Sequence, residues 1–520
     1  MAQPILLDPA PLDNSGVAWW RQLTGYHWFV FLIASSAWLF DCLDQRLFSL
    51  ARIPALNALK PNTPPADVQA FAKVVTAFFL IGWGIGGMIF GALGDKFGRA
   101  RMLMLTILIY SAFTGLSFFS HSWFDFTVCR FLTGLGVGGV FGLAVALIAE
   151  TVPSGARVQA LGLLQVLSTV GNVAAGGIKA LIDTLEQSKV IVAGEGWRWM
   201  FLVGAIPAVL VVFTHKRLKE PEGWLKLKAE GRLPKGSILA PYRNLVTNKR
   251  WRKNLIVGAL IASTGVIGLW AIGEYAVDLQ RRVFNTHYEQ QNPRAVLTKP
   301  ADETPEQVKD REARQAASDQ ARAATIKAGV DRSINIAYLL NMLGAGTGMW
   351  LFTKLAAATG RRTAFAVGFA AALVVTAYSY WKMETPGDAY WMMPLMGAAQ
   401  LGPFAGFAIY LPELFPGSLR STGTSFCYNL GRFMAAGGSF FSAYLTALFA
   451  TADKTSLLPL RYSAIVMCSI FLIGLLTLPF APETRGQPLP TDDEPTPEPG
   501  VPKEFPVIPG GAAQPAPRGT

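Results

Sequence analysis

Three ionisable residues interrupt apolar stretches in the first part of the sequence: Asp41, Asp44 and Arg130. The two acids are three residues apart, so a helix would place them on one face. At a rise of about 1.5 Å per residue, counted from Tyr26 and Trp123, Asp41 and Arg130 lie at a similar depth. They could therefore form a pair, with Asp44 as the alternative partner of the arginine. An acid beside a buried arginine can couple proton binding to a change in helix contacts, whereas a static salt bridge would be structural.

Arg432 differs from this group because no acid in the C-terminal half obviously balances it. It follows Arg420 by twelve residues, which is about 18 Å along a helix and near the middle of a membrane. A guanidinium at that depth can bind a carboxylate through two hydrogen bonds, so we predict that a substrate supplies the anion. Pairing with a carbonyl group or with an acid of the first helix is the alternative.

Other polar and aromatic residues in the apolar stretches could line the same cavity. The substrate-binding candidates besides Arg432 are Tyr428, Asn429, Gln165, Asn172, Trp270, Asn341, Gln400 and Tyr410. Further aromatic residues that could stack on an apolar or aromatic substrate are Trp38, Phe141, Tyr275 and Phe404. Each such residue is also a plausible packing residue, so position in the fold has to decide between the two interpretations.

The composition places these residues in a membrane protein. Of 520 residues, 51% are hydrophobic and only 15% are charged, whereas soluble domains carry about 25% charged residues. Four cysteines lie in separate apolar stretches and four histidines form no cluster, so we expect no disulfide framework, no metal site and no cofactor. Neither a phosphate-binding loop nor a nucleophile–base set is evident in the sequence, so an enzyme is not expected.

Twelve apolar stretches are long enough to cross a bilayer as helices, which predicts an all-α membrane protein. They lie near 26–48, 70–92, 102–120, 124–149, 158–182, 198–214, 255–279, 333–355, 363–382, 389–412, 422–448 and 461–480. The segment 215–253 holds twelve Lys and Arg against three acids, whereas 284–332 holds eight of each. By the positive-inside rule the first segment and both termini are cytoplasmic, and the second segment is outside. The formal charge of +12 then belongs to the inner membrane surface, and no nucleic-acid partner is expected.

An internal duplication divides the chain. Three patterns recur at offsets of 262, 263 and 261 residues: Gly98-Arg99 as Gly360-Arg361, Glu150-x-x-Pro153-x-x-x-Arg157 as Glu413-x-x-Pro416-x-x-x-Arg420, and Pro221-Glu222 as Pro482-Glu483. Such offsets predict two parallel six-helix bundles that can rock about a central site. The expected organisation is a cytoplasmic segment 1–24, a bundle 25–214, a cytoplasmic loop 215–253, a bundle 254–485 with an outer, partly helical insert 284–332, and a disordered cytoplasmic tail 486–520.

Two motifs carry a family resemblance. The stretch Gly91-Ala-Leu-Gly94-Asp95-Lys96-Phe97-Gly98-Arg99-Ala-Arg101 resembles the signature loop of the major facilitator superfamily, and Arg130-Phe-Leu-Thr-Gly134-Leu-Gly136 resembles its helix 4 motif. The resemblance covers roughly 25–485 and implies the twelve-helix major facilitator fold. It implies gating for Gly94, Asp95, Arg99, Arg101, Glu150, Arg157, Glu413 and Arg420. The second copy of the loop, 353–362, lacks the acid, so we expect an asymmetric latch.

The helix 1 pattern Asp41-x-x-Asp44 is similar to that of metabolite–proton symporters, including the aromatic-acid and sialate/lactate branches. We therefore predict a secondary active transporter, a proton-coupled symporter of a small organic acid that works as a monomer by alternating access in the inner membrane of the cell. Two alternatives stay open. Gln165 and the ending 482–486 resemble a sugar or polyol porter, and a transporter fold can also serve a sensor that transports nothing.

Overall fold

A computed structural model describes residues 17–214, 216–297, 304–449 and 456–492, and at 65–66, 210, 212–214, 270–271, 274 and 436–443 it describes the backbone alone. Regular structure in these ranges is entirely helical. The α-helices are α1 (Gly25–Leu59), α2 (Pro65–Phe97), α3 (Arg99–Leu116), α4 (Trp123–Thr151), α5 (Ser154–Gln187), α6 (Gly196–Gly204), α7 (Pro207–Thr214), α8 (Glu222–Ala229), α9 (Ala240–Thr247), α10 (Lys249–Ile267), α11 (Gly273–Gln291), α12 (Pro305–Thr359), α13 (Arg361–Lys382), α14 (Pro386–Glu413), α15 (Arg420–Leu448), α16 (Leu458–Met467) and α17 (Ile470–Thr477).

Nine helical segments in the described ranges are long and apolar enough to cross a membrane, and they coincide with nine of the twelve predicted spans. The other three predicted spans are helical as well. The span 198–214 is divided between α6 and α7, 255–279 contains a π-helical turn between α10 and α11, and 422–448 lies within α15. The predicted all-α fold of twelve crossing segments is therefore confirmed.

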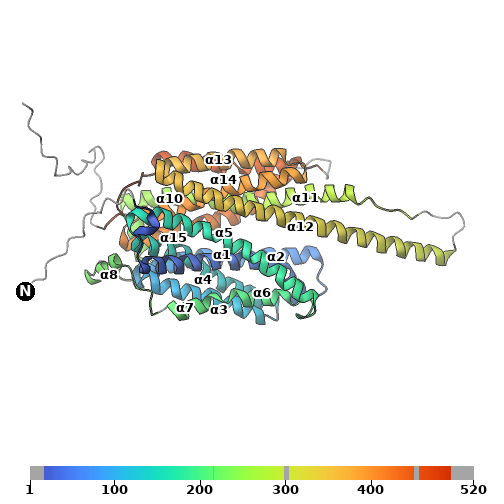
Figure 1. The fold of residues 1–520 in the computed structure, drawn as a ribbon, viewed down its shortest axis with the longest axis horizontal. Helices are drawn as coiled ribbons and strands as arrows, with labels where there is room; N and C mark the ends of the chain where they lie inside the picture. Colours follow the sequence, from blue (N-terminus) through green and yellow to red (C-terminus); the bar gives the residue numbers. More distant parts are fainter. Residues whose placement is uncertain (1–16, 215, 298–303, 450–455, 493–520) are drawn as a thin grey trace, which may run out of the picture.

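The helices form two bundles that lie side by side (Figure 1). In the N-terminal bundle α2 packs on α4 and α1 on α5, whereas in the C-terminal bundle α12 packs on α14 and α10 on α15. Glycines permit this close packing, because a Cβ atom on Gly86 would lie 2.0 Å from the carbonyl oxygen of Leu135 on α4. A Cβ atom on Gly344 of α12 would likewise lie 1.9 Å from the carbonyl oxygen of Pro394 on α14. The two bundles meet mainly where α2 contacts α15 and where α5 contacts α12.

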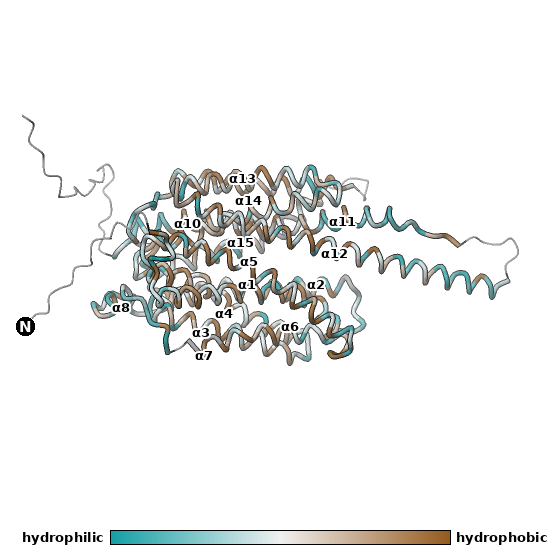
Figure 2. Tube along the Cα trace, viewed as in Figure 1, coloured by the Kyte–Doolittle hydropathy of each residue, from teal (hydrophilic) through white to brown (hydrophobic). Residues whose placement is uncertain are grey.

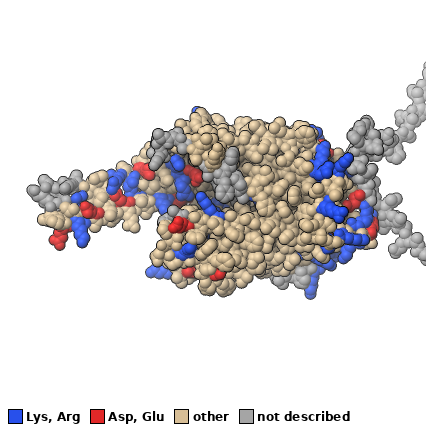
Figure 3. Space-filling model, turned by 180° about the vertical axis from the view of Figure 1, so that it is seen from behind, with Lys and Arg blue, Asp and Glu red and all other residues tan. Residues whose placement is uncertain are grey.

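The two ends of the molecule differ in shape. The basic segment 216–253, with α8 and α9, lies at one end, which we call the loop end. At the opposite end α11 and α12 continue far beyond the bundles as a hydrophilic hairpin, which we call the arm (280–291 and 305–331; Figure 2). Between the ends, the surface is almost free of charged side chains on the face that Figure 3 shows. This apolar belt is what a bilayer-spanning protein requires.

The arm is a direct continuation of two membrane helices. α12 begins at Pro305 with a capping box, in which the Thr304 hydroxyl accepts from the Gln307 N–H and the Gln307 side chain accepts from the Thr304 N–H. The helix then runs for 55 residues, or about 80 Å. An ion pair between Arg294 and Asp319, with Nε 2.9 Å from Oδ1, ties the two halves of the hairpin together. The composition of the insert, rich in helix formers, accounts for this outcome.

Candidate functional site

Two buried charged residues that form no ion pair within the described part of the chain lie close together at the boundary between the bundles. Asp41 on α1 and Arg432 on α15 are both buried. Their charges interact although no pair of their side-chain atoms lies within 4 Å. One comes from each bundle, so any movement of the bundles changes the distance between them.

Arg432 is held by aromatic rings and amides rather than by an acid. Its guanidinium stacks on the ring of Trp83, 3.7 Å from the centroid, and on the ring of Tyr428 at 4.4 Å. Nη1 donates to Asn429 Oδ1 at 3.0 Å and to the Tyr428 carbonyl at 3.3 Å. Among the described residues no carboxylate lies within 4 Å of it, and Nε has no hydrogen-bond partner. The guanidinium is thus pre-oriented and keeps donor capacity for an anion.

Asp41 is fully buried. One carboxyl oxygen, Oδ2, accepts from Gln45 Nε2 at 3.2 Å, whereas Oδ1 has no partner in the part of the chain that the structure describes. A buried carboxylate without a close cation is costly in free energy, and protonation removes that cost. This environment suits a group that gains and loses a proton during a cycle.

Arg130 pairs with Asp44, the alternative partner, and not with Asp41. The Nη1 to Oδ2 distance is 3.8 Å, and both side chains are buried. Helix α3 and the turn that follows it supply the rest of the site: Thr114 of α3 donates to Asp44 at 2.9 Å, and Arg130 Nη2 donates at 2.6 Å to Oγ of Ser117, the residue after α3. All of these residues belong to the N-terminal bundle. The pair is therefore compatible with the static salt bridge that the sequence left open.

Below Arg432, towards the loop end, four of the predicted aromatic residues, Trp38, Phe141, Phe404 and Tyr428, form one cluster across the bundle interface. Phe141 on α4 stacks on Tyr428 with centroids 3.7 Å apart, and Trp38 on α1 lies 5.0 Å from Phe141. Gln165 joins the cluster to α14: its Oε1 accepts from Trp38 Nε1 at 2.6 Å, and its Nε2 donates to the Phe404 carbonyl at 3.0 Å. The cluster therefore joins the two bundles at this level.

The remaining predicted substrate residues are engaged in helix packing. Asn341 donates to the Met393 carbonyl, Gln400 to Thr376 and Tyr410 to the Pro482 carbonyl, all within the C-terminal bundle. Asn172 accepts from Tyr338 across the α5–α12 contact at 3.3 Å. The side chain of Trp270 lies outside the residues whose side chains are described.

At the loop end Asp95 locks α2 to the start of α15. Its carboxylate accepts from the backbone N–H groups of Ser421 and Thr422 at 3.1 and 2.8 Å and from the Thr422 hydroxyl at 2.6 Å. A carboxylate is favourable at this position because the first N–H groups of a helix lack internal partners. Gly94 permits the approach, since a Cβ atom there would lie 2.8 Å from Ser421 Oγ. The predicted signature loop is therefore a contact between the bundles.

A network of arginines and glutamates extends this contact between the bundles. Arg99 lies 3.0 Å from Asp95 and 3.1 Å from Glu150, and it also donates to the Gly417 carbonyl of the other bundle. Arg420 reaches back from α15 to Glu150 at 2.8 Å. Glu150 thus joins one arginine from each bundle, and these contacts hold the two bundles together at the loop end.

The second copy repeats part of this network within the C-terminal bundle. Arg361, the counterpart of Arg99, forms two hydrogen bonds with Glu413, at 3.0 and 2.7 Å. The position in α12 that corresponds to Asp95 of α2 carries no acid. Instead α5 and α12 pack closely here, because a Cβ atom on Gly162 would lie 2.1 Å from Thr353 Oγ1. The two copies of the network are therefore asymmetric, in line with the missing acid in the second copy.

Two other predicted gating residues do not join the network of ion pairs. Arg157 forms no ion pair within the described residues, and Arg101 contributes its backbone N–H, which donates to Glu220 at 3.0 Å.

One sequence correspondence needs correction. The pairing of Pro221-Glu222 with Pro482-Glu483 is wrong, because the residue equivalent to Glu483 is Glu220, 263 positions earlier. Glu220 accepts from the backbone N–H groups at the start of α3, and Glu483 accepts from Arg361 and its neighbour at the start of α13. Burial raises the pKa of the Glu483 carboxyl, but the four backbone N–H donors around it outweigh this and hold its pKa below the usual value. Glu220 thus caps α3, which follows Gly98, and Glu483 caps α13, which follows Gly360.

Sequence reasoning missed several residues of the site. Trp83 stacks on Arg432 from the opposite bundle, and Thr114 and Ser117 complete the Asp44–Arg130 pair. A bulky Trp83 between two glycines, in a helix that packs tightly, was an available signal. Thr114 and Ser117 carried none, since hydroxyls in membrane helices commonly bond their own backbone.

We expect Asp95→Asn to loosen the loop-end gate. The change removes the buried charge that Arg99 and the start of α15 share, so the closed arrangement loses about 2–5 kcal/mol. Hydrogen exchange of the first turn of α15 should become at least tenfold faster than in the unmodified protein. Asp125→Asn is the matched control, because Asp125 caps α4 at the arm end. Equal exchange of α15 in the two variants would show that Asp95 does not hold the gate.

Comparison with known proteins agrees with this architecture. A family model described as Major Facilitator Superfamily matches residues 29–280. The "Probable 4-methylmuconolactone transporter" of Cupriavidus pinatubonensis is 26% identical over 470 residues, covering 90% of this chain and 94% of the relative. The "Cis,cis-muconate transport protein" of Acinetobacter baylyi is 26% identical over 434 residues, covering 81% and 91%. The solved structure of the proton:xylose symporter XylE of E. coli has a TM-score of 0.58 at 19% identity, covering 89% of this chain and 98% of that chain.

Two bundles of membrane-spanning helices, together with these family and fold matches, define a multi-pass membrane transporter. The chain belongs to the major facilitator superfamily. It is a transporter of small molecules and not an enzyme.

Proposed function

We propose that this transporter is a proton-coupled symporter of a small organic acid. The observation that carries the proposal is the pair of Arg432 and Asp41: among the described residues, the buried guanidinium has no counter-ion within 4 Å and the buried carboxyl group has an oxygen without a partner. The first suits a substrate carboxylate and the second suits a proton. Relatives named as muconate and methylmuconolactone transporters support the same class of substrate.

Proton and substrate binding are linked through the charges of these two residues. While Asp41 is ionised, its negative charge opposes the arrival of an anion at Arg432. Protonation of Asp41 removes that charge and leaves Arg432 free to bind the carboxylate. Substrate and proton therefore load together, and the neutral combination lets the bundles rock past each other with little cost in free energy.

We place the loop end in the cytoplasm and the arm outside, with both termini cytoplasmic, in the inner membrane of a cell. The basic residues of the loop end support this orientation. The closed loop-end gate then corresponds to a state that does not open to the cytoplasm. A monomer suffices, because the site and the gate are built from the two halves of one chain.

A sugar or polyol substrate receives less support. Gln165, the residue on which that alternative rests, has both amide groups bonded within the protein, to Trp38 and to the Phe404 carbonyl. A sugar hydroxyl would have to displace one of these bonds. The likeness to XylE is at 19% identity and concerns the fold alone.

Uptake into proteoliposomes under an inward proton gradient tests the proposal. The panel holds labelled cis,cis-muconate, benzoate, lactate, sialic acid and xylose. We expect at least one acid to accumulate and the accumulation to collapse with a protonophore. Accumulation of xylose alone, or of nothing in either direction across preloaded vesicles, would overturn the proposal in favour of a sugar porter or a sensor.

A further inference from the structure

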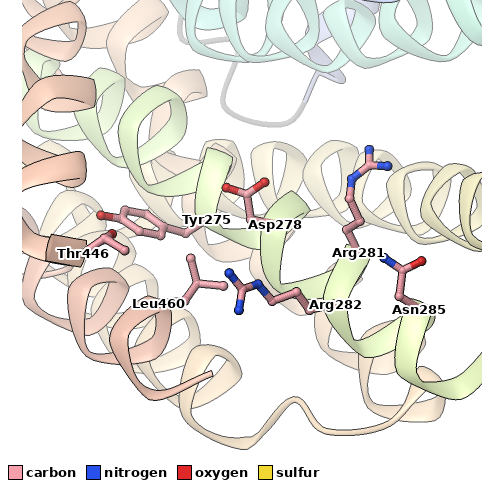
Figure 4. Close-up of a pocket in the computed structure, with 7 residues that line it drawn as sticks. All are labelled: Tyr275, Asp278, Arg281, Arg282, Asn285, Thr446 and Leu460. Carbon is pink, nitrogen blue, oxygen red and sulfur yellow. The ribbon is translucent and has the colours of Figure 1, made fainter. Parts of the chain in front are cut away.

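A cavity lies at the arm end of the C-terminal bundle and belongs to no site described so far. It has a volume of about 380 Å³. Its lining residues come from α11, α15 and α16: Tyr275, Asp278, Arg281, Arg282, Asn285, Thr446 and Leu460 (Figure 4). Five of the seven follow the three-to-four-residue spacing of one face of α11.

The charges around this cavity favour an anion. Arg282 extends towards the cavity in Figure 4, and it has no ion pair among the described residues. Arg281 has Asp331 of the arm at 3.7 Å, but both side chains are about half exposed, so this pair is weak. Lys73 from α2 of the other bundle also acts electrostatically on Asp278. Among the described residues named here, the cations therefore outnumber the acids by three to two.

The cavity also offers an apolar surface. The buried Tyr275 and Leu460 form part of its wall, beside the guanidinium of Arg282. An inorganic ion would leave this surface unused, whereas an organic acid can place its carboxylate on the arginine and its carbon skeleton against the tyrosine and leucine.

The position of the cavity relates it to the central site. Thr446 in its wall and Arg432 lie on the same helix, α15. They are fourteen residues apart, or about 21 Å along the axis. The arm-end cavity therefore lies near the membrane boundary, above the unpaired central arginine.

We propose that the arm-end cavity is an access site, at which Arg282 and Arg281 capture an organic carboxylate before it moves to Arg432. The inference rests on the proposed function, since it assumes that the transported substrate is an organic acid. It adds a second binding step at the outer face. Asp278 reduces the attraction and so lets the anion leave the access site for the deeper one.

Charge variants give two effects of opposite sign. Arg282→Gln should raise the KM for cis,cis-muconate, or for whichever acid the proteoliposome panel identifies, about tenfold with little change in kcat. Asp278→Asn should lower the same KM severalfold. Arg314→Gln is the matched control, because Arg314 lies on the exposed arm with Asp310 as its neighbour. Equal KM values in all three variants would overturn the access site.

Thiol labelling gives a readout that does not depend on transport. In a Cys129→Ser background, Asn285→Cys is labelled from outside with an impermeant maleimide, and the transported acid should slow the labelling. This protection should persist when Arg432→Ala is added, whereas adding Arg282→Gln should abolish it. Equal protection by chloride would identify a general anion site and overturn the assignment to organic acids.

The two proposals fail in distinguishable ways. If the unmodified protein accumulates no acid, the proposed function fails at the first experiment. If it accumulates an acid but Arg282→Gln changes neither KM nor protection, only the access site is wrong, and Arg432 keeps its role.

Discussion

Arg432→Ala is expected to abolish proton-driven uptake of the organic acid while the protein remains folded. The substrate carboxylate would lose its charge-assisted hydrogen bonds at the centre of the site, a loss of about 2–5 kcal/mol. This corresponds to a fall in kcat/KM of at least 30-fold. The measurement is initial uptake into proteoliposomes at several substrate concentrations, beside the melting temperature of the purified variant.

The stability part of this prediction follows from the environment of Arg432. Its stacking on the buried rings of Trp83 and Tyr428 contributes about 2 kcal/mol for each ring. Removal of the guanidinium also removes a buried charge that has no close counter-ion, which offsets the lost stacking. We therefore expect the melting temperature to change by only a few degrees.

Two further variants separate charge from geometry and folding. Arg432→Lys keeps the positive charge but loses the planar fork, so it should retain some binding with a clearly higher KM. Arg130→Ala removes the partner of the buried Asp44 and should destabilise the protein by about 3–5 kcal/mol. If Arg432→Ala transported with an unchanged KM, or unfolded as Arg130→Ala is expected to, Arg432 would be a structural residue.

The depth of a residue in the membrane could be predicted from the sequence, but its direction around the helix could not. Counting along the helices placed Asp41 and Arg130 at one level, which is correct to within a turn. The choice between Asp41 and Asp44 depends on the end of α3, where Thr114 bonds to Asp44 and the next turn begins with Ser117, which bonds to Arg130. Neither hydroxyl could be assigned before the packing of α3 was known.

Because the direction of a side chain around its helix could not be predicted, some substrate candidates lie away from Arg432 in the structure. Gln400 and Tyr410 lie on α14, a helix that is buried on nearly all sides. An apolar pattern all round such a helix does not reveal which face meets the other bundle. Arg432 was identified more easily because a missing counter-ion is a property of the sequence. Its partner Trp83 was not, since it depends on the contact between α2 and α15.

More of the loop-end contacts than of the central site could be predicted from the sequence. The signature loop and the duplicated Glu-x-x-Pro-x-x-x-Arg pattern fixed Asp95, Glu150 and Arg420 at helix ends on one side of the membrane. Charges at helix ends have few possible partners, so their association was predictable. The mistaken match of Glu222 with Glu483 shows the weakness of a dipeptide: the capping role belongs to Glu220, at the offset of 263 that the glutamate–arginine pattern already indicated.

Asp41→Asn is expected to uncouple transport from the proton gradient while leaving exchange intact. Asparagine has the size of the protonated acid and can still accept from Gln45. With one proton carried per monovalent anion, one pH unit supports about tenfold accumulation in the unmodified protein. The variant should accumulate nothing above equilibrium, yet labelled substrate should still enter vesicles preloaded with unlabelled substrate.

The pH dependence of binding gives an independent test of the same residue. In the unmodified protein the KM for the anion should rise with pH, because ionised Asp41 opposes the substrate at Arg432. In Asp41→Asn the KM should stay at the low-pH value throughout. A KM that still rises with pH, or intact gradient-driven accumulation, would exclude Asp41 as the proton site.

Asp44→Asn is the matched comparison for Asp41→Asn, because the two acids lie on the same face of α1 and differ in one respect. Asp44 neutralises Arg130, so its loss leaves a buried arginine unpaired and should cost about 3–5 kcal/mol of stability. Asp41 neutralises no arginine within 4 Å, and its replacement should leave the melting temperature nearly unchanged. If the folded Asp44→Asn variant were the uncoupled one, proton binding would belong to the pair with Arg130, and Asp41 would be a packing residue.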